Sequence, residues 1–92
     1  MSARSHFNSS AFKHGISEAD ILWVFDNGTY DGLLERGEKP SDDKYLLIGY
    51  DLNANPIEVI YNYIDEEDTV NVFHAMKCRN AYTHLLNVGG KK

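Results

Sequence analysis

The run H-A-M-K-C-R, from His74 to Arg79, holds the residue types in this chain that are best suited to chemistry. It places an imidazole, which can accept or donate a proton near neutral pH, close to two cations. That set is sufficient to cleave RNA without a metal ion, because the 2′-hydroxyl of RNA attacks the neighbouring phosphorus and the protein need only move protons and stabilise negative charge. We therefore take His74, Lys77 and Arg79 as candidate catalytic residues.

Lys13 and His14 form a second pair of this kind. The pattern from Asn8 to His14 predicts a short helix that stops at Gly15, so both residues would lie at its end. They add a cation and a second imidazole to the candidate residues for RNA cleavage. His14 is thus a further candidate for proton transfer, and Lys13 is a candidate for binding the substrate.

Each candidate also has a structural interpretation. A histidine within a strand is commonly satisfied by a backbone carbonyl, which would account for His74. Lys77 and Arg79 would then be the solvated end of that strand, with Arg79 paired to one of the many carboxylates. The tyrosines of the predicted strands fit either base stacking or core packing: Tyr45, Tyr50, Tyr61 and Tyr63.

No residues are spaced as metal ligands. The four histidines are scattered along the chain, and the single cysteine, Cys78, excludes an internal disulfide and a cysteine-rich zinc site. The acidic run from Asp65 to Asp68 is expected at a hairpin tip, where such runs are usually solvated turns. We therefore expect no metal and no cofactor.

The helix that begins after Ser17 has the clearest local signals of any element. Ser17 can cap the free N–H groups, and Asp20 follows at the spacing of a capping box. Apolar residues then recur on one stripe until Asn27 and Gly28, which end the helix. This helix must cover one face of whatever sheet follows.

Three strong strand patterns come next, separated by turns short enough for hairpins: Lys44–Leu52, Ile57–Asp65 and Thr69–Lys77. A weaker pattern at Tyr30–Glu35 allows an additional edge strand. Alternation in the last strand places His74 on one face with Val72 and Met76. A final helix from about Asn80 to Val88 carries Tyr82 on its apolar stripe.

These elements predict an α+β fold with an antiparallel meander of three to four strands, two N-terminal helices and one C-terminal helix. Adjacent strands joined by short turns favour antiparallel order, since parallel strands need long crossovers. We expect one domain over residues 1–92, with a core from about 8 to 88 and a flexible basic tail at 89–92.

Charge is distributed unevenly along the chain. The net charge is −5, but all 14 acidic residues lie between residues 15 and 76, while both ends carry only cations. If the two ends meet, an acidic body would present one basic face. No signal peptide or membrane-length apolar run is present, so we expect a cytoplasmic protein that binds no membrane.

The chain resembles BrnT-type toxins at two places. One is K-H-G-I-S at Lys13–Ser17, which is followed by an amphipathic helix ending in V-F, and the other is Y-L-L-I-G-Y-D at Tyr45–Asp51. It is more similar still to a group of short BrnT-like proteins through further motifs: I-G-x-D at Ile48–Asp51, I-E-V at Ile57–Val59, H-A-M at His74–Met76 and Y-x-x-L-L from Tyr82 to Leu86. The resemblance covers roughly residues 8–87.

The resemblance implies a RelE-like fold and the toxin part of a type II toxin–antitoxin pair, acting as a metal-independent endoribonuclease. It further implies a small ribbon-helix-helix antitoxin as partner, with no binding to DNA by the toxin alone. In such a fold the N-terminal and C-terminal helices meet near the end of the last strand. Lys13, His14, His74, Lys77 and Arg79 would then converge, with Tyr82 as a further substrate-binding residue.

An interaction protein without catalytic activity is the alternative function. The net charge of −5 favours it, because a protein that binds RNA is normally basic. In this case the chain keeps the same fold and binds a protein partner through its acidic body. A continuous basic groove would favour ribonuclease activity, and dispersed cations would favour the interaction domain.

Overall fold

A computed structural model describes residues 4–87 of the chain. The elements in chain order are β1 (Arg4–Phe7), η1 (Ser9–Phe12), α1 (Glu18–Asn27), β2 (Tyr30–Glu35), η2 (Pro40–Asp42), β3 (Lys44–Tyr50), β4 (Pro56–Ile64), η3 (Asp65–Glu67), β5 (Thr69–Lys77) and η4 (Asn80–Asn87), where η denotes a 3₁₀ helix. The tail predicted at residues 89–92 lies outside the described residues.

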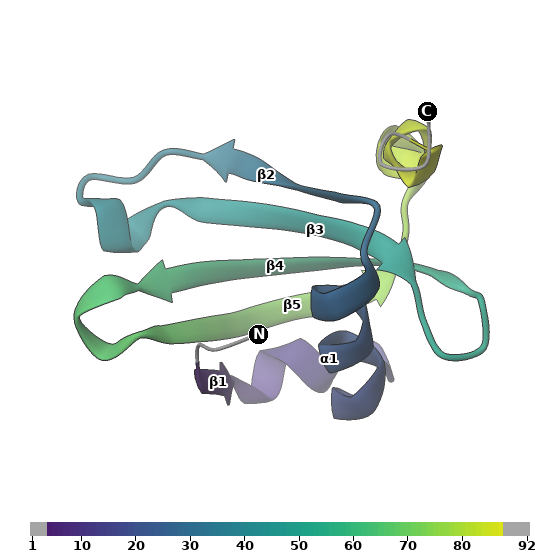
Figure 1. The fold of residues 1–92 in the computed structure, drawn as a ribbon, viewed down its shortest axis with the longest axis horizontal. Coiled ribbons are helices and arrows are strands. Elements are labelled where there is room, and N and C mark those ends of the chain that lie inside the picture. Colours follow the sequence, from purple (N-terminus) through teal and green to yellow (C-terminus); the bar gives the residue numbers. More distant parts are fainter. Residues whose placement is uncertain (1–3, 88–92) are drawn as a thin grey trace.

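The five strands form a single mixed sheet in the order β1-β5-β4-β3-β2. The pairs β2–β3, β3–β4 and β4–β5 are antiparallel, whereas β1 is parallel to β5, with Arg4 opposite Thr69. Figure 1 shows α1 and η1 on one side of the sheet, and η4 beyond its opposite side at one end. The sheet is therefore covered on both faces only near that end.

The predicted fold, an antiparallel meander of three to four strands with three helices, is wrong both in its sheet and in its helices. The sheet is a five-stranded mixed sheet, and among the described residues α1 is the one α-helix. The residues around 8–14, predicted as a helix, contain only η1, which ends at Phe12; Gly15, three residues further on, adopts a left-handed φ of +82°. The predicted C-terminal helix is 3₁₀ through Asn87, a geometry that the three-residue spacing of Tyr82 and Leu85 suits.

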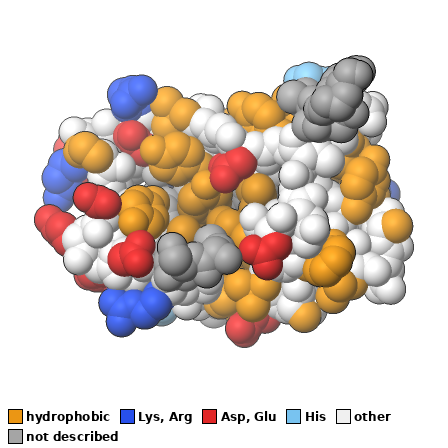
Figure 2. Space-filling model, in the orientation of Figure 1, with side chains coloured by type: hydrophobic (Ala, Val, Ile, Leu, Met, Phe, Trp, Pro, Cys, Tyr) orange, Lys and Arg blue, Asp and Glu red, His pale blue; other side chains and the backbone are white. Residues whose placement is uncertain are grey.

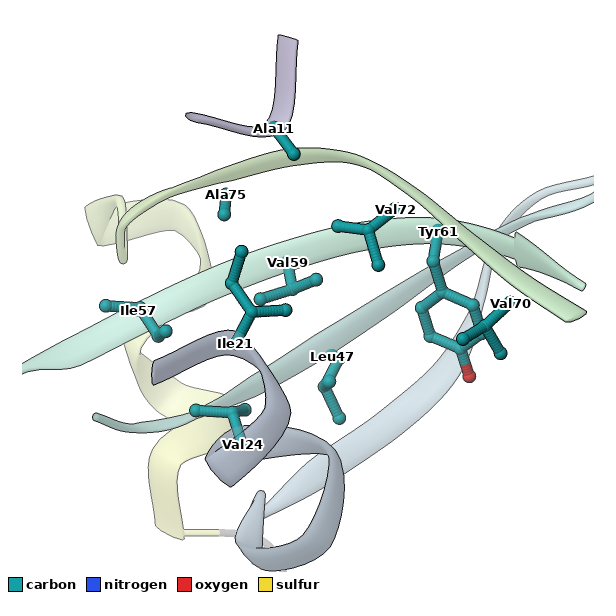
Figure 3. Close-up of a cluster of buried hydrophobic side chains, with 10 residues drawn as sticks. All are labelled: Ala11, Ile21, Val24, Leu47, Ile57, Val59, Tyr61, Val70, Val72 and Ala75. Carbon is teal, nitrogen blue, oxygen red and sulfur yellow. The ribbon is translucent and has the colours of Figure 1, made fainter. Parts of the chain in front are cut away.

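The main core lies between the sheet and α1 (Figure 3). Side chains from η1, α1, β3, β4 and β5 point into this layer. All are buried: Ala11, Ile21, Val24, Leu47, Ile57, Val59, Tyr61, Val70, Val72 and Ala75. Ser17 caps α1 as predicted, because its side chain accepts a hydrogen bond from the Asp20 N–H. This layer supplies most of the apolar burial that stabilises the fold.

A second, smaller core lies on the other face, beneath η4. Leu46, Ile48, Ile60 and Cys78 are buried there, and Phe73, Tyr82, Leu85 and Leu86 pack against them. The Thr29 hydroxyl donates to the Leu85 carbonyl at 2.9 Å, which fastens η4 to the start of β2.

No helix in the described residues is long and apolar enough to cross a bilayer.

A β-bulge in β5 corrects part of the face assignment predicted for the last strand: His74 and Met76 share a face as predicted, but Val72 does not lie on it. His74 pairs with Ile60, but Val72 pairs with Tyr61, so Phe73 is an extra residue. Beyond the bulge the alternation shifts by one position, because a single inserted residue moves later side chains to the other face. Val72 therefore packs on the α1 side, whereas His74 lies on the η4 side.

Candidate functional site

A buried carboxylate, Glu58, is the centre of the most polar cluster of the fold. Its neighbours Ile57 and Val59 point toward α1, so Glu58 points to the opposite face, where the chain after β5 covers it. The side chain is 0 % exposed. A carboxylate without access to water is stable only when hydrogen bonds or opposite charges replace its hydration.

Arg79 and His74 provide that replacement. The Arg79 backbone N–H donates to Glu58 Oε1 at 2.9 Å. The guanidinium donates to Glu58 Oε2 from Nη2 at 2.5 Å and from Nε at 3.0 Å, and its Nε also lies 3.1 Å from Oε1. His74 Nε2 lies 3.0 Å from Oε2. Burial alone would raise the pKa of the Glu58 carboxyl, but these hydrogen bonds outweigh burial and lower its pKa.

The contact with Glu58 also fixes the state of the His74 ring. An ionised carboxylate can only accept hydrogen bonds, so Nε2 of His74 must carry the proton. Nδ1 is then the basic nitrogen of the neutral ring, and it bonds to no described residue. The side chain is 22 % exposed, so a ligand can reach it. Glu58 therefore orients the imidazole.

His14 brings a second imidazole to the same place. The ring centroids of His14 and His74 are 5.8 Å apart and the ring planes are inclined by 70°. The segment before His14 is held along the edge of β5, since the Asn8 N–H donates to the Val72 carbonyl and the Ser10 hydroxyl donates to the carbonyl of the bulged Phe73. The bulge thus provides an anchor for the segment that carries His14.

Arg79 lies between the buried carboxylate and solvent. Its side chain is 51 % exposed even though Nε and Nη2 point to Glu58. Its Nη1 bonds to no described residue, and its guanidinium carbon lies 5.7 Å from the centre of the Tyr82 ring. The guanidinium is therefore held in a fixed orientation and still offers a donor to an anion.

The structure gathers four of the six predicted site residues and separates the other two. His14, His74, Arg79 and Tyr82 are linked through the contacts above. Lys77 pairs with Ile57 and so lies on the α1 side, where it lines a separate pocket of about 320 Å³. Lys13 is exposed at the end of η1, and none of the described contacts links it to the cluster. The convergence predicted for all six is thus only partial.

The comparisons with known proteins give a family. A family model described as "Domain of unknown function (DUF4258)" matches residues 4–76. The chain belongs to the DUF4258 family. No curated protein and no solved structure matches it. The matched part of this DUF4258 domain includes His14, Glu58 and His74 and stops before Arg79.

Glu58 is the residue that the sequence reasoning missed. It stands in the strand run I-E-V-I-Y, where its alternation with apolar residues resembles an ordinary solvated face. The available signal is that apolar Ile60 shares the strand face of Glu58, because a face that carries apolar residues is partly covered and an acid under such cover needs a cationic partner. No three His, Cys, Asp or Glu side chains of the described residues are grouped to hold a metal ion.

Proposed function

We propose that the protein is a metal-independent endoribonuclease, the toxin-like member of a toxin–antitoxin pair. The observation that carries the proposal is the contact of His74 with buried Glu58 beside a second imidazole, His14. The motifs shared with BrnT-type toxins, given above, support it from the sequence. The proposal concerns activity only and does not extend to a RelE-like fold.

In the proposed reaction His74 Nδ1 takes the proton of a ribose 2′-hydroxyl, and the oxygen attacks the adjacent phosphorus. The bond from phosphorus to the 5′-oxygen breaks, and protonated His14 donates a proton to that leaving oxygen. The exposed edge of Arg79 neutralises the charge that develops on the phosphate. The products are a 2′,3′-cyclic phosphate and a free 5′-hydroxyl, so atoms and charges balance without a co-reactant.

The test is cleavage of a single-stranded RNA by purified protein in the presence of a chelator. We expect His74→Ala and His14→Ala each to lose roughly 10²–10⁴-fold in rate. His84→Ala is the matched control, because this exposed histidine of η4 makes no contact with the cluster and should leave the rate unchanged. A substrate with a single 2′-deoxy position should resist cleavage there. Equal cleavage by all variants would mean a contaminating nuclease and would refute the site.

A non-catalytic interaction domain is the second candidate. One observation favours it: Glu58 joins β4, β5 and the start of η4, which is also what a purely structural network would do. The net charge of −5 points the same way. Absence of RNA cleavage, together with harmless expression in cells, would support this function over the nuclease.

A small ribbon-helix-helix antitoxin is the partner we propose for either function. The basis is the sequence resemblance, together with a core whose small size makes stabilisation by a partner advantageous. Co-expression with the product of the neighbouring gene should yield a complex whose melting temperature rises with partner concentration. Failure to co-purify, with no rescue of growth, would contradict the proposed partnership.

A further inference from the structure

The outer edge of β2 is open. In the described residues β2 pairs with β3 and has no strand on its other side, and it runs along the upper border of the sheet in Figure 1. Leu33 and Leu34, at a bulge in this strand, are 42 % and 38 % exposed. An edge strand of this kind offers unpaired backbone N–H and C=O groups to an added strand.

The surroundings of this edge are acidic. Between residues 30 and 44 the chain carries five acids and three cations. On β2 itself Asp31 and Glu35 flank the exposed leucines. The Asp31 carboxylate accepts a hydrogen bond from the Tyr61 hydroxyl at 2.7 Å, and Glu35 has Lys44 3.8 Å away. Figure 2 shows hydrophobic side chains interspersed with acidic ones over this view of the molecule. The edge therefore combines backbone donors and acceptors, apolar contacts and negative charge.

The charges disfavour pairing with a second copy of this chain in the register centred on Leu33. If two β2 strands paired in antiparallel order about Leu33, Asp31 of each copy would oppose Glu35 of the other. Like charges directly opposite each other on adjacent strands are destabilising. Such charges are a common device against self-association at sheet edges, and they attract a strand of opposite charge instead.

We propose that β2 is a docking edge for an extended segment of a partner protein in which Lys or Arg alternates with apolar residues. The segment adds a sixth strand, with main-chain hydrogen bonds providing affinity and its cations meeting Asp31 and Glu35. Its apolar side chains cover Leu33 and Leu34. This interface lies on the sheet edge opposite β1 and does not depend on whether the protein cleaves RNA.

The probe is a synthetic peptide of about ten residues that alternates Lys and Val, a length matched to an added strand. We expect micromolar binding in fluorescence anisotropy and slower hydrogen exchange of the β2 amides. A Glu-Val peptide and a Lys-Val peptide with a central proline should not bind, because one reverses the charge and the other breaks the strand.

Two variants separate this edge from general electrostatic attraction. Glu35→Lys should weaken binding by about tenfold or more, because it places a like charge at the interface. Glu66→Lys makes the same change of charge at η3 and should leave binding unchanged. RNA cleavage by Glu35→Lys should match wild type if the protein is a nuclease, so failure of the interface and failure of the catalytic proposal are distinguishable.

Three outcomes would overturn the proposal. The first is the absence of binding by the Lys-Val peptide. The second is a sign of non-specific attraction. Glu35→Lys and Glu66→Lys would then weaken peptide binding equally, or the peptide would slow hydrogen exchange of amides outside β2. The third is a concentration-dependent dimer whose β2 amides are protected without peptide, because a second copy would then occupy the edge.

Discussion

At the scale of single residues, the loss of Glu58 should destabilise the fold strongly. Glu58→Ala leaves the Arg79 guanidinium and the His74 ring without their buried partner. Arg79 is half exposed and can be hydrated, so the cost is that of the lost hydrogen bonds to a buried charged partner, about 1–3 kcal/mol of the free energy of unfolding. Urea denaturation measures this loss of unfolding free energy. Glu66→Ala, at an exposed position, is the control, and its free energy of unfolding should lie within about 0.5 kcal/mol of wild type. A similar small loss for both variants would contradict the structural role of Glu58.

The same carboxylate should make stability depend on acidic pH. The pKa of Glu58 in the folded protein lies below its ordinary value of 4.5, so the unfolded chain binds a proton more readily than the folded one. Glu58 therefore contributes its full stabilisation above pH 4.5, and this is lost as the pH falls through the folded pKa.

The measurement is the melting temperature of wild type and Glu58→Gln from about pH 3 to about pH 7. Wild type should lose more of its melting temperature than the variant on acidification, because glutamine does not titrate. Parallel curves for the two proteins would show that Glu58 does not contribute to acid sensitivity.

The sequence predicted which types of residue form the site. It did not predict which of these residues contact one another. The H-A-M-K-C-R run correctly marked His74 and Arg79 as neighbours of one cluster. Lys77 was misplaced because alternation along a strand puts it on the face opposite Met76, and spacing alone does not show which face carries the cluster. Glu58 was not singled out because its partners come from a strand and a turn more than ten residues away.

At the scale of elements, locally specified segments were predictable and segments that depend on distant partners were not. Ser17 and the apolar stripe after it specify α1, and the hairpin-forming strands β3, β4 and β5 lie where the sequence indicates. The residues of β1 show no apolar alternation, so this strand exists only because β5 offers an edge to it. The bulge at Phe73 has no local signal either.

The contact between α1 and β3 depends on two glycines. A Cβ on Gly49 would lie 2.9 Å from the Gly28 Cα and 3.0 Å from Val24 Cγ1, closer than packed atoms allow. Gly49→Ala should therefore push the end of α1 away from the sheet and cost about 1–3 kcal/mol of the free energy of unfolding.

Chemical denaturation checks this prediction for Gly49→Ala. Asn53→Ala, an exposed change in the following hairpin, is the control and should alter the free energy of unfolding by less than about 0.5 kcal/mol. An unchanged midpoint for Gly49→Ala would mean that α1 can move away from β3 at no cost.

At the scale of the whole molecule, removing residues 1–7 should make the protein self-associate. This deletion removes β1 and exposes the edge of β5 from Thr69 to Val72, and open edges pair readily with other chains. We expect a lower melting temperature and a mass that rises with concentration in light scattering. Removing only residues 1–3 is the control and should leave the melting temperature and the mass as they are in the full chain. A truncated protein without β1 that stays monomeric and equally stable would contradict a structural role for β1.

The pairing of β1 with β5 also orders events during protein synthesis. Among the strands of the described residues β1 is translated first and β5 last, so β1 cannot pair until β5 has been made. His14 follows β1 along the same edge and meets His74 only when that edge is complete. If the proposed chemistry is correct, a nascent chain in which β5 has not yet been made lacks the completed site and is inactive. The ribosome that makes a potentially toxic nuclease would then be protected from it until β5 has been translated and has paired with β1.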